Sequence, residues 1–333
     1  MRVLVTGGAG YIGSVITDQL IEDAHSVVVY DNLSKGHRES VSERATFIDG
    51  DLLDEKAITD ALKSHAIDAV IHMAASSLVG ESMTNPERYY LNNVIGSVRL
   101  LNAMLAAGVR MMVLSSTAAT YGEPVRQPIS EDDPTAPSNP YGETKLAVER
   151  AMHWYGLAHQ LRFVSLRYFN AAGATARRGE RHDPETHLIP LVLRAARDHK
   201  HAVTIFGNDY PTRDGTCVRD YIHVSDLARA HVSALAALAD GRLRAEIFNL
   251  GCGDGYTVKE VIDAATRVTG RDIPVVVGAR RPGDPAILIA SSDKIRRVLG
   301  WIPQHSSLDE IVSSAWKWEE SVMTTPRGHN MSG

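Results

Sequence analysis

The feature that most constrains the fold of this 333-residue chain is a glycine-rich turn close to its N-terminus. The segment VLVTGGAGYIGS places Gly7, Gly10 and Gly13 three residues apart, after an apolar run and before a helical pattern. Glycines at this spacing permit a tight turn, a close approach of the backbone to a pyrophosphate, and close packing of a helix on a strand. The free N–H groups of the helix N-terminus then favour an anion. The sequence therefore predicts a strand–turn–helix unit that binds a dinucleotide.

An acidic residue follows the glycines at the distance that such a unit requires. The segment SVVVYDN ends a second apolar run at Asp31. A carboxylate there binds the adenine ribose diol and repels a 2′-phosphate, so we predict NAD rather than NADP. Lys35 and Arg38 lie nearby and weaken this preference slightly. The alternative is that Asp31 is an ordinary turn residue that binds no ligand. The glycines upstream of it favour the ribose-binding interpretation.

Short apolar runs alternate with helical patterns as far as residue 168. This alternation is typical of a parallel sheet with helices on both faces, so we predict a Rossmann-type, doubly wound α/β fold. The predicted strands are Val3–Thr6, Ser26–Asp31, Thr46–Asp49, Ala69–His72, Met111–Ser115 and Phe163–Arg167, and the predicted helices cover 12–23, 54–64, 86–107 and 140–157.

The alternation ends after residue 168, where longer loops predict a smaller C-terminal α/β lobe. Strands are predicted near 203–206, 246–249 and 274–277, and helices at 187–199, 225–239, 257–269 and 308–320. No linker rich in Gly, Ser or Pro separates the lobes, so we expect the chain to pass between them more than once. The predicted division is an NAD-binding domain at 1–168 with a return near 220–250, a substrate lobe at 169–325, and a flexible tail at 326–333.

Composition narrows the classes of partner. The formal net charge is −5 and no long basic run occurs, which argues against a nucleic-acid partner. Cys217 and Cys252 provide no disulfide framework, so we expect a reducing, cytoplasmic location. No signal peptide is expected ahead of the first strand, and no apolar run is long enough for a membrane span.

A tyrosine and a lysine four residues apart form the candidate catalytic pair. In SNPYGETKLAVER, Tyr141 and Lys145 share one face of a predicted helix that begins near Pro140. A free phenol has a pKa near 10, and a nearby cation lowers it by roughly 1–3 units. Lys145 and a positively charged nicotinamide are therefore expected to prepare Tyr141 for acid–base work. Hydroxyls at 115–117, in VLSSTAATYG, end a predicted strand and can bind a substrate oxygen.

Taken together, these motifs resemble the extended short-chain dehydrogenase/reductase family. The first half provides TGGAGYIGS, DNLSKG, SSTAATYG, NPYGETK and RYFNAAGA. The second half adds IFGNDYPTRDGTCVRDYIHVSDLA, NLG and RRPGDPAILIASS, which are similar to members that epimerise UDP-hexoses at C4. The resemblance covers nearly the whole chain. It implies NAD-dependent interconversion of UDP-glucose and UDP-galactose through hydride abstraction, rotation of a 4-keto sugar and hydride return, and it implies a homodimer.

The resemblance also implies roles for individual residues, with Tyr141, Lys145 and Thr117 as the catalytic set. With the residues already derived, the cofactor-binding set is Gly7, Gly10, Tyr11, Ile12, Gly13, Asp31, Asn32, Asp51, Leu52, Met73, Ala74, Ala75, Asn92, Ser115, Tyr141, Lys145 and Tyr168. The substrate-binding set is Thr117, Tyr141, Asn170, His187, Leu188, Thr204, Phe206, Arg219, Arg281, Asp284 and Leu288. The two arginines suit a diphosphate because guanidinium binds it in a bidentate way; a structural salt bridge is the alternative for either one.

Several positions depart from the family pattern. Thr117 stands where serine is frequent, and Ser77 stands where a cofactor-contacting lysine is frequent. Thr186 and His187 replace a pair of asparagines, and Leu288 occupies a position that varies between a large aromatic and a small residue. These differences leave the preferred sugar open, so UDP-N-acetylglucosamine remains an alternative substrate.

Two other functions are weaker predictions. A nucleotide-sugar dehydratase or decarboxylase of the same fold places an acid just after the strand-end hydroxyl, where this chain has Ala118 and Ala119. A regulator that only senses NAD would not need the complete set of Thr117, Tyr141 and Lys145.

Three further patterns are assigned to structure or substrate binding. The segment HDPETH (182–187) lacks the histidine spacing of zinc proteases and its proline favours a loop, so we predict a polar substrate loop and no metal. His72 is predicted to be a core histidine. An apolar stripe in the helix at 86–107 is predicted to face the core, with partial exposure to a partner as the alternative; its members are Leu91, Val94, Val98, Leu101 and Leu105.

Overall fold

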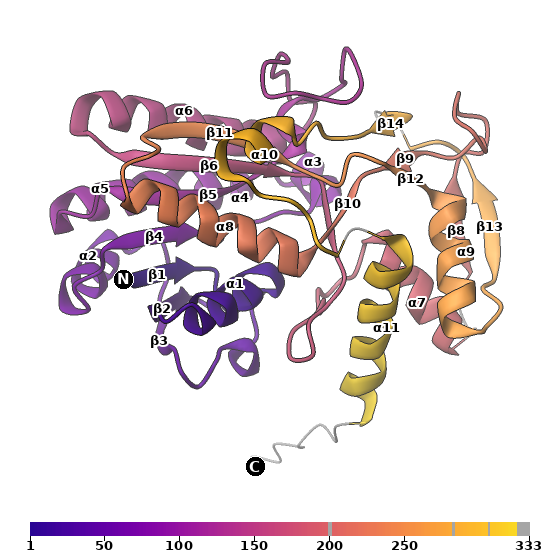
Figure 1. Cartoon of the computed structure of the whole chain (residues 1–333), viewed down its shortest axis with the longest axis horizontal. Coiled ribbons are helices and arrows are strands. Elements are labelled where there is room, and N and C mark those ends of the chain that lie inside the picture. Colours follow the sequence, from indigo (N-terminus) through magenta and orange to yellow (C-terminus); the bar gives the residue numbers. More distant parts are fainter. Residues whose placement is uncertain (199–201, 282–283, 306, 325–333) are drawn as a thin grey trace.

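A seven-stranded parallel sheet forms the centre of the larger part of the molecule in the computed structural model, which describes residues 1–198, 202–281, 284–305 and 307–324 (Figure 1). In spatial order the strands are β11 (Ala245–Leu250), β6 (Arg162–Tyr168), β5 (Met111–Thr117), β4 (Ala69–His72), β1 (Arg2–Thr6), β2 (Ser26–Asp31) and β3 (Thr46–Asp49). The strand order reverses between β1 and β4, as in a doubly wound sheet. The prediction of this fold class is confirmed.

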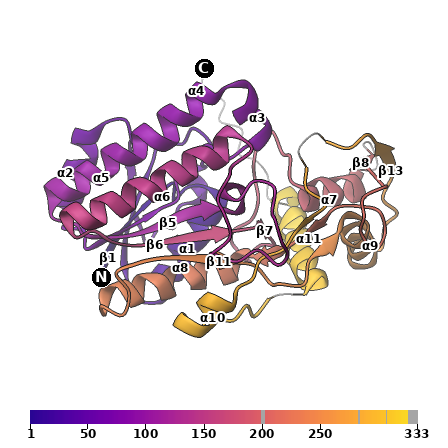
Figure 2. The ribbon, with the colours of Figure 1, turned by 90° about the horizontal axis from the view of Figure 1, so that it is seen from above.

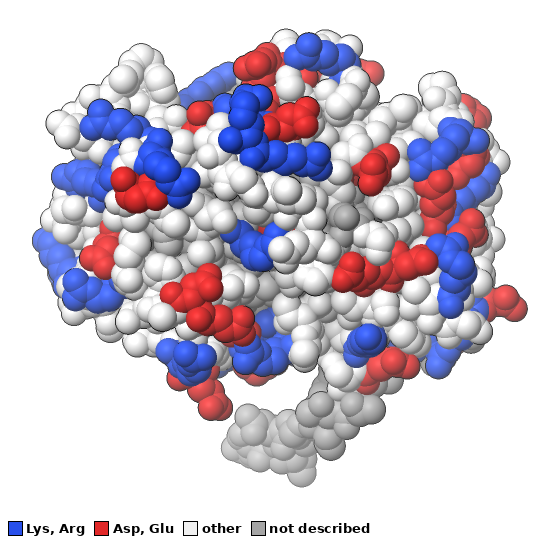
Figure 3. Space-filling model, in the orientation of Figure 1, with Lys and Arg blue, Asp and Glu red and all other residues white. Residues whose placement is uncertain are grey.

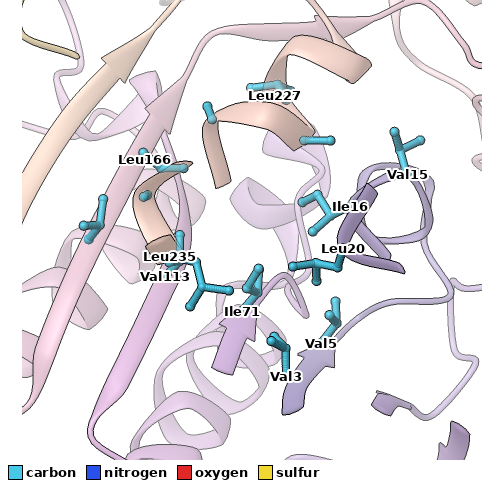
Figure 4. Close-up of a cluster of buried hydrophobic side chains, with 14 of the residues drawn as sticks. Val3, Val5, Val15, Ile16, Leu20, Ile71, Val113, Leu166, Leu227 and Leu235 are labelled. Atoms are coloured by element: carbon cyan, nitrogen blue, oxygen red, sulfur yellow. The ribbon is translucent and has the colours of Figure 1, made fainter. Parts of the chain in front are cut away.

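Helices cover both faces of the sheet because its strands are apolar on both sides (Figure 2). One face carries α1 (Tyr11–Glu22) and α8 (Val224–Ala239), and the other carries α2 (Glu55–Ser64), α5 (Gly96–Ala107) and α6 (Pro140–His159). Val3 and Val5 of β1 pack towards α1 and α8, as Figure 4 shows, whereas Leu4 packs into the opposite cluster. This alternation follows from the two-residue period of a strand, and burial of each such side chain contributes about 1.5–3 kcal/mol.

A smaller cluster lies beyond the carboxyl ends of the strands. It contains α7 (Leu188–Asp198), α9 (Val258–Thr269), α11 (Leu308–Thr324) and the parallel pair β8 (Val203–Phe206) and β13 (Val275–Gly278). Short strands connect the two parts: β7 (Asn170–Ala172) pairs with β10 (Tyr221–His223), and β9 (Val218–Arg219) lies between β12 (Tyr256–Thr257) and β14 (Ile287–Leu288). The strand predicted at 246–249 is β11, which joins the large sheet beside β6. The predicted tail at 326–333 lies outside the described residues.

The predicted helix at 86–107 is divided into three. It consists of α4 (Pro86–Tyr89), a π-helical segment (Tyr90–Ile95) and α5. The wider π-helical turn rotates the apolar stripe, so Leu101 is buried while 48% of Leu91 is exposed. The prediction that the whole stripe faces the core was therefore wrong for its N-terminal end.

The outer surface carries mixed charge. On the face shown in Figure 3, basic and acidic side chains are interspersed rather than separated into regions of one sign. Among the described residues, none of the helices combines the length and hydrophobicity needed to cross a bilayer.

Candidate active site

A cleft of about 1580 Å³ runs along the carboxyl ends of the central strands and continues towards α7, β8 and β9. Residues at the ends of β2, β4, β5 and β6 line it, including Asp31, Met73, Thr117 and Tyr168. Ligands of open α/β sheets bind at this edge, close to the point where the strand order reverses.

The glycine turn lies at one end of the cleft and is shaped by close backbone contacts. Gly7 has φ +69°, and a Cβ added there would lie 2.5 Å from the backbone nitrogen of Ala74. A Cβ on Gly13 would lie 2.2 Å from the carbonyl oxygen of Gly7. Gly10 precedes α1 and makes no side-chain capping bond, which leaves the N–H groups of the first helical turn available. This turn fits the pyrophosphate of a dinucleotide.

Asp31 lies at the end of β2, and its carboxylate organises the neighbouring backbone. Its oxygens accept hydrogen bonds from the N–H groups of Ala9 (3.0 Å) and Leu33 (2.9 Å). Burial raises the pKa of Asp31, while these two hydrogen bonds act in the opposite direction. A Cβ on Gly36 would approach the same carboxylate to 3.0 Å, so glycine keeps this side of Asp31 open.

Tyr141 and Thr117 meet at the centre of the cleft. Tyr141 lies in the first turn of α6, which begins after Asn139; the Asn139 side chain accepts a hydrogen bond from the N–H of Gly142 (2.9 Å). Thr117 is the last residue of β5. Burial raises the pKa of Tyr141 to about 12, and a hydrogen bond with the Thr117 side chain counteracts this rise. Without a further positive charge, the chain therefore holds Tyr141 as a neutral phenol.

Lys145 lies on the same helix as Tyr141, and its side chain is held against the neighbouring strand β5. Its ammonium donates a hydrogen bond to the carbonyl oxygen of Ser115 (2.8 Å). Burial lowers the pKa of Lys145 to about 8, and the negative charge of Glu149 acts in the opposite direction. Lys145 is thus held against β5, and burial is the main influence on the phenol. That Lys145 and a bound nicotinamide together lower the Tyr141 pKa stays a prediction.

Glu149, which the sequence analysis did not identify, anchors α6, the helix that carries Tyr141 and Lys145. Its buried carboxylate accepts hydrogen bonds from Ser116 on β5 (2.6 Å) and from two guanidinium nitrogens of Arg167 on β6 (3.0 and 2.5 Å). The Arg167 guanidinium also lies over the Tyr121 ring, 4.8 Å from its centroid. Glu149 thereby holds α6 against the two strands that end in Thr117 and Tyr168. The signal in the sequence was a glutamate four residues after Lys145.

The far end of the cleft is lined by residues from the smaller part. The Arg281 guanidinium stacks on Phe206, 3.9 Å from the ring centroid. Arg219 is paired with Asp284, so the salt bridge considered as its alternative role is present. Both arginines nevertheless line the cleft, and aromatic and guanidinium groups together suit a base and a diphosphate.

The buried aspartate of the VRDYIHV motif explains how this end is held in place. The Asp220 carboxylate accepts backbone N–H groups from Cys252 (2.7 Å), Gly253 (3.0 Å) and Ala290 (3.0 Å). It therefore joins the segments that follow β11 and β14 to Arg219, its neighbour in the sequence.

With one exception, all residues of the predicted catalytic, cofactor-binding and substrate-binding sets line this cleft. The exception is Leu288, which is half-buried on β14 with Arg219 as its register partner. The lining also contains residues that sequence reasoning missed, among them Glu180, Arg194, Cys217 and Trp318.

Comparison with known proteins places this geometry in a family. The model of the NAD dependent epimerase/dehydratase family matches residues 3–251. The UDP-glucose 4-epimerase of Halalkalibacterium halodurans is 54% identical over 323 residues, which cover 96% of each chain.

Solved structures of UDP-glucose 4-epimerases superpose on the chain along almost its whole length. The enzyme of Brucella ovis in complex with NAD has a TM-score of 0.92 and 45% identity, with coverage of 95% of this chain and 97% of that one. The enzyme of Bifidobacterium longum in complex with NAD+ and UDP has a TM-score of 0.90 and 35% identity, with coverage of 96% and 98%.

Proposed function

The chain belongs to the NAD dependent epimerase/dehydratase family, and from that premise we propose how its cleft interconverts UDP-glucose and UDP-galactose. The reaction is an isomerisation that inverts C4 of the hexose and depends on NAD. The observation that carries the proposal is the meeting of Tyr141, Thr117 and the glycine turn in one cleft. An acid–base group would then act on the 4-hydroxyl oxygen, and a bound hydride acceptor would act on the carbon that carries it.

The two ligands occupy different parts of the cleft. The glycine turn and Asp31 would hold NAD, and Phe206, Arg219 and Arg281 would hold the UDP. On this assignment residues 1–168 and the returning segment 220–250 hold the cofactor, and residues 169–325 hold mainly the UDP-sugar.

Tyr141 carries the proton transfer. It removes the proton of the hexose 4-hydroxyl, while Thr117 hydrogen-bonds to the same oxygen. When bound, NAD supplies the acceptor for the C4 hydride and, in its oxidised form, a positive charge. The cleft would let the 4-keto sugar rotate so that the hydride could return to its other face, and Tyr141 would return the proton. Lys145, fixed by Ser115, contacts the nicotinamide ribose.

A direct test needs no added cofactor. We expect purified protein, incubated with UDP-galactose alone, to produce UDP-glucose, because the hydride that leaves C4 also returns. Heat denaturation should release NAD rather than NADP, since Asp31 disfavours a 2′-phosphate. Chromatography of the sugar nucleotides and of the released cofactor measures both results. No product without added NAD, or release of mainly NADP, would contradict the proposal.

The choice of sugar is expected to depend on residue 288. Leu288 does not line the cleft, but Arg219, its partner in the neighbouring strand, does. A longer side chain at position 288 would therefore enter the part of the cleft that holds the sugar. We expect Leu288→Tyr to lower kcat/KM for UDP-N-acetylglucosamine relative to UDP-glucose by about 5- to 150-fold, which corresponds to an overpacking cost of about 1–3 kcal/mol.

The matched control for this ratio is Ile287→Tyr, because neighbouring residues of a strand point to opposite faces. Steady-state kinetics of the two sugars in parent and variants provide the comparison. If Leu288→Tyr leaves the ratio unchanged, selectivity lies elsewhere in the cleft, with Thr186 and His187 as the next residues to vary.

We also propose a homodimer formed through the outer helices. Large apolar side chains are exposed on α6 and on the adjoining π-helical segment, including Ile95 (44%), Trp154 (66%) and Leu157 (66%). A buried tryptophan is often central to an interface, so Trp154→Glu should weaken dimerisation by about 2 kcal/mol or more, roughly 30-fold. Val125→Glu changes a residue in a loop that is even more exposed (76%) and should have no effect. Sedimentation velocity over a concentration series distinguishes the two; a monomeric parent protein would refute the dimer.

A reducing compartment such as the cytoplasm suits the two thiols. Cys217 and Cys252 are both buried and free. Cys217 lines the cleft, where oxidation would add polar atoms beside Arg219.

A further inference from the structure

The segment between β7 and α7 brings three potential metal ligands together. One nitrogen of His182, one nitrogen of His187 and one carboxylate oxygen of Glu180 all lie within 4.8 Å of one another. The spacing of the two histidines had argued against a metal, but Glu180 supplies a third donor. Two histidines and one carboxylate form a donor set that binds zinc and leaves one coordination position open.

Carboxylates already orient both imidazole rings. Nδ1 of His182 lies 2.5 Å from Glu180 Oε1, and Nδ1 of His187 lies 2.8 Å from Glu185 Oε1. A histidine that binds a metal usually donates its other ring N–H to a carboxylate, which fixes the tautomer. Glu185 thus fixes the His187 ring beside Glu180, with Nδ1 of His187 3.9 Å from Glu180 Oε2.

An independent observation concerns Glu185, which lies beside the cluster. The Glu185 side chain is completely buried, and its Oε2 has no hydrogen-bond partner. Within the described ranges, no lysine or arginine forms an ion pair with Glu180 or Glu185; the neighbouring Arg178 and Arg181 pair with Asp18 and Glu39 instead. Among the described residues, only His182 and His187 form ion pairs with these two carboxylates, and a divalent ion would balance their charge.

The cluster is held in place by both parts of the molecule. Lys35 donates to the carbonyl oxygen of Asp183 (3.1 Å), and the Trp318 indole N–H donates to that of Glu180 (3.2 Å). Nε2 of His37 lies 3.2 Å from the carbonyl oxygen of Arg181. The ligand-bearing loop is therefore fixed on two sides, as an ordered metal site requires.

We propose that Glu180, His182 and His187 bind one divalent transition-metal ion of the zinc class, with Glu185 supporting His187. The three side chains line the substrate cleft. A metal ion bound to His187 prevents this side chain from contacting the substrate, so binding of the metal inhibits epimerisation. This inhibitory effect rests on the proposed function, whereas binding of the metal does not.

Calorimetric titration of metal-free protein with Zn²⁺, in a buffer that does not bind metals, tests the site. We expect one ion per chain for the parent protein. His182→Gln and Glu180→Gln should each weaken binding by more than the roughly 10- to 100-fold that loss of a supporting partner costs, and Glu185→Gln should fall within that range. His159→Gln alters an exposed histidine at the end of α6 and is the matched control.

A second measurement guards against variants that fold poorly. Zn²⁺ should raise the Tm of the parent and of His159→Gln, but not of His182→Gln, and anomalous scattering from zinc in crystals should locate the ion at His182. Absence of binding in the parent protein would overturn the proposal and show that the imidazoles alone balance the carboxylates. Undiminished binding in both His182→Gln and Glu180→Gln would overturn it equally.

Turnover tests the inhibition separately. Zn²⁺ should inhibit the parent protein over the concentration range in which it binds, whereas it should not lower the turnover of His182→Gln below that variant's own metal-free value. Unchanged turnover at a saturated site would refute the inhibition, and the calorimetric result would still decide whether the site exists.

Discussion

Tyr141→Phe is expected to lower kcat by roughly 10²–10⁴-fold, the usual contribution of a positioned acid–base group. The substitution removes only the hydroxyl, and the ring keeps its buried position and its edge-on packing against Tyr89, at a centroid distance of 6.5 Å. The fold and the bound NAD should therefore remain. Steady-state turnover of UDP-galactose, together with the NAD content of the purified variant, measures both effects.

The matched control is Tyr155→Phe, which also removes a phenolic hydroxyl from α6. The Tyr155 hydroxyl donates to Asn102 Oδ1 (2.7 Å) outside the cleft. Its loss should cost about 1 kcal/mol of unfolding free energy and leave kcat unchanged. Near-normal turnover of Tyr141→Phe would show that another group moves the proton.

Glu149→Ala should destabilise the folded chain by about 3–5 kcal/mol, because it leaves the buried Arg167 guanidinium without its carboxylate. The pair is almost completely buried, with side-chain exposures of 3% for Glu149 and 4% for Arg167. Ser116 loses its hydrogen-bond acceptor as well. Urea unfolding curves of the parent and variant measure the difference in midpoint.

Two comparisons separate the buried charge from a general loss of packing. The double variant Glu149→Met, Arg167→Met removes both charges and should recover much of the lost stability. Asp60→Ala breaks the exposed ion pair with Lys56 and should hardly change the midpoint. A midpoint for Glu149→Ala equal to that of Asp60→Ala would mean that the pair contributes nothing to the anchoring of α6.

Local patterns predicted most of the fold and much of the site. The two-residue period of β1 and the glycine spacing after it are encoded within a dozen residues, and each predicts its structure without reference to the remainder of the chain. The catalytic pair was likewise local, since Tyr141 and Lys145 share a helix face. The resemblance of the motifs to a known family added residues that are remote in the sequence, such as Phe206 and Arg281, and both line the far end of the same cleft.

Other features depend on distances between segments that are remote in the sequence. The direction of the Lys145 ammonium towards Ser115 and the approach of Glu149 to Arg167 arise only when α6 packs on β5 and β6. Burial then sets the Tyr141 pKa, and no spacing along the chain reports burial. The position of Leu288 also depends on the tertiary structure, because the pairing of β14 with β9 places it outside the cleft lining.

The sequence by itself determined the parallel sheet, the glycine turn and the placement of Tyr141 and Lys145 on one helix face, because each follows from the pattern of a single strand, turn or helix. Only the tertiary structure decided which charges meet. Glu180 approaches His182 and His187 because Trp318 and Lys35, from opposite ends of the chain, hold the loop between them. Electrostatic energies depend on distance in space and on exclusion of water, and both quantities exist only once the chain has folded.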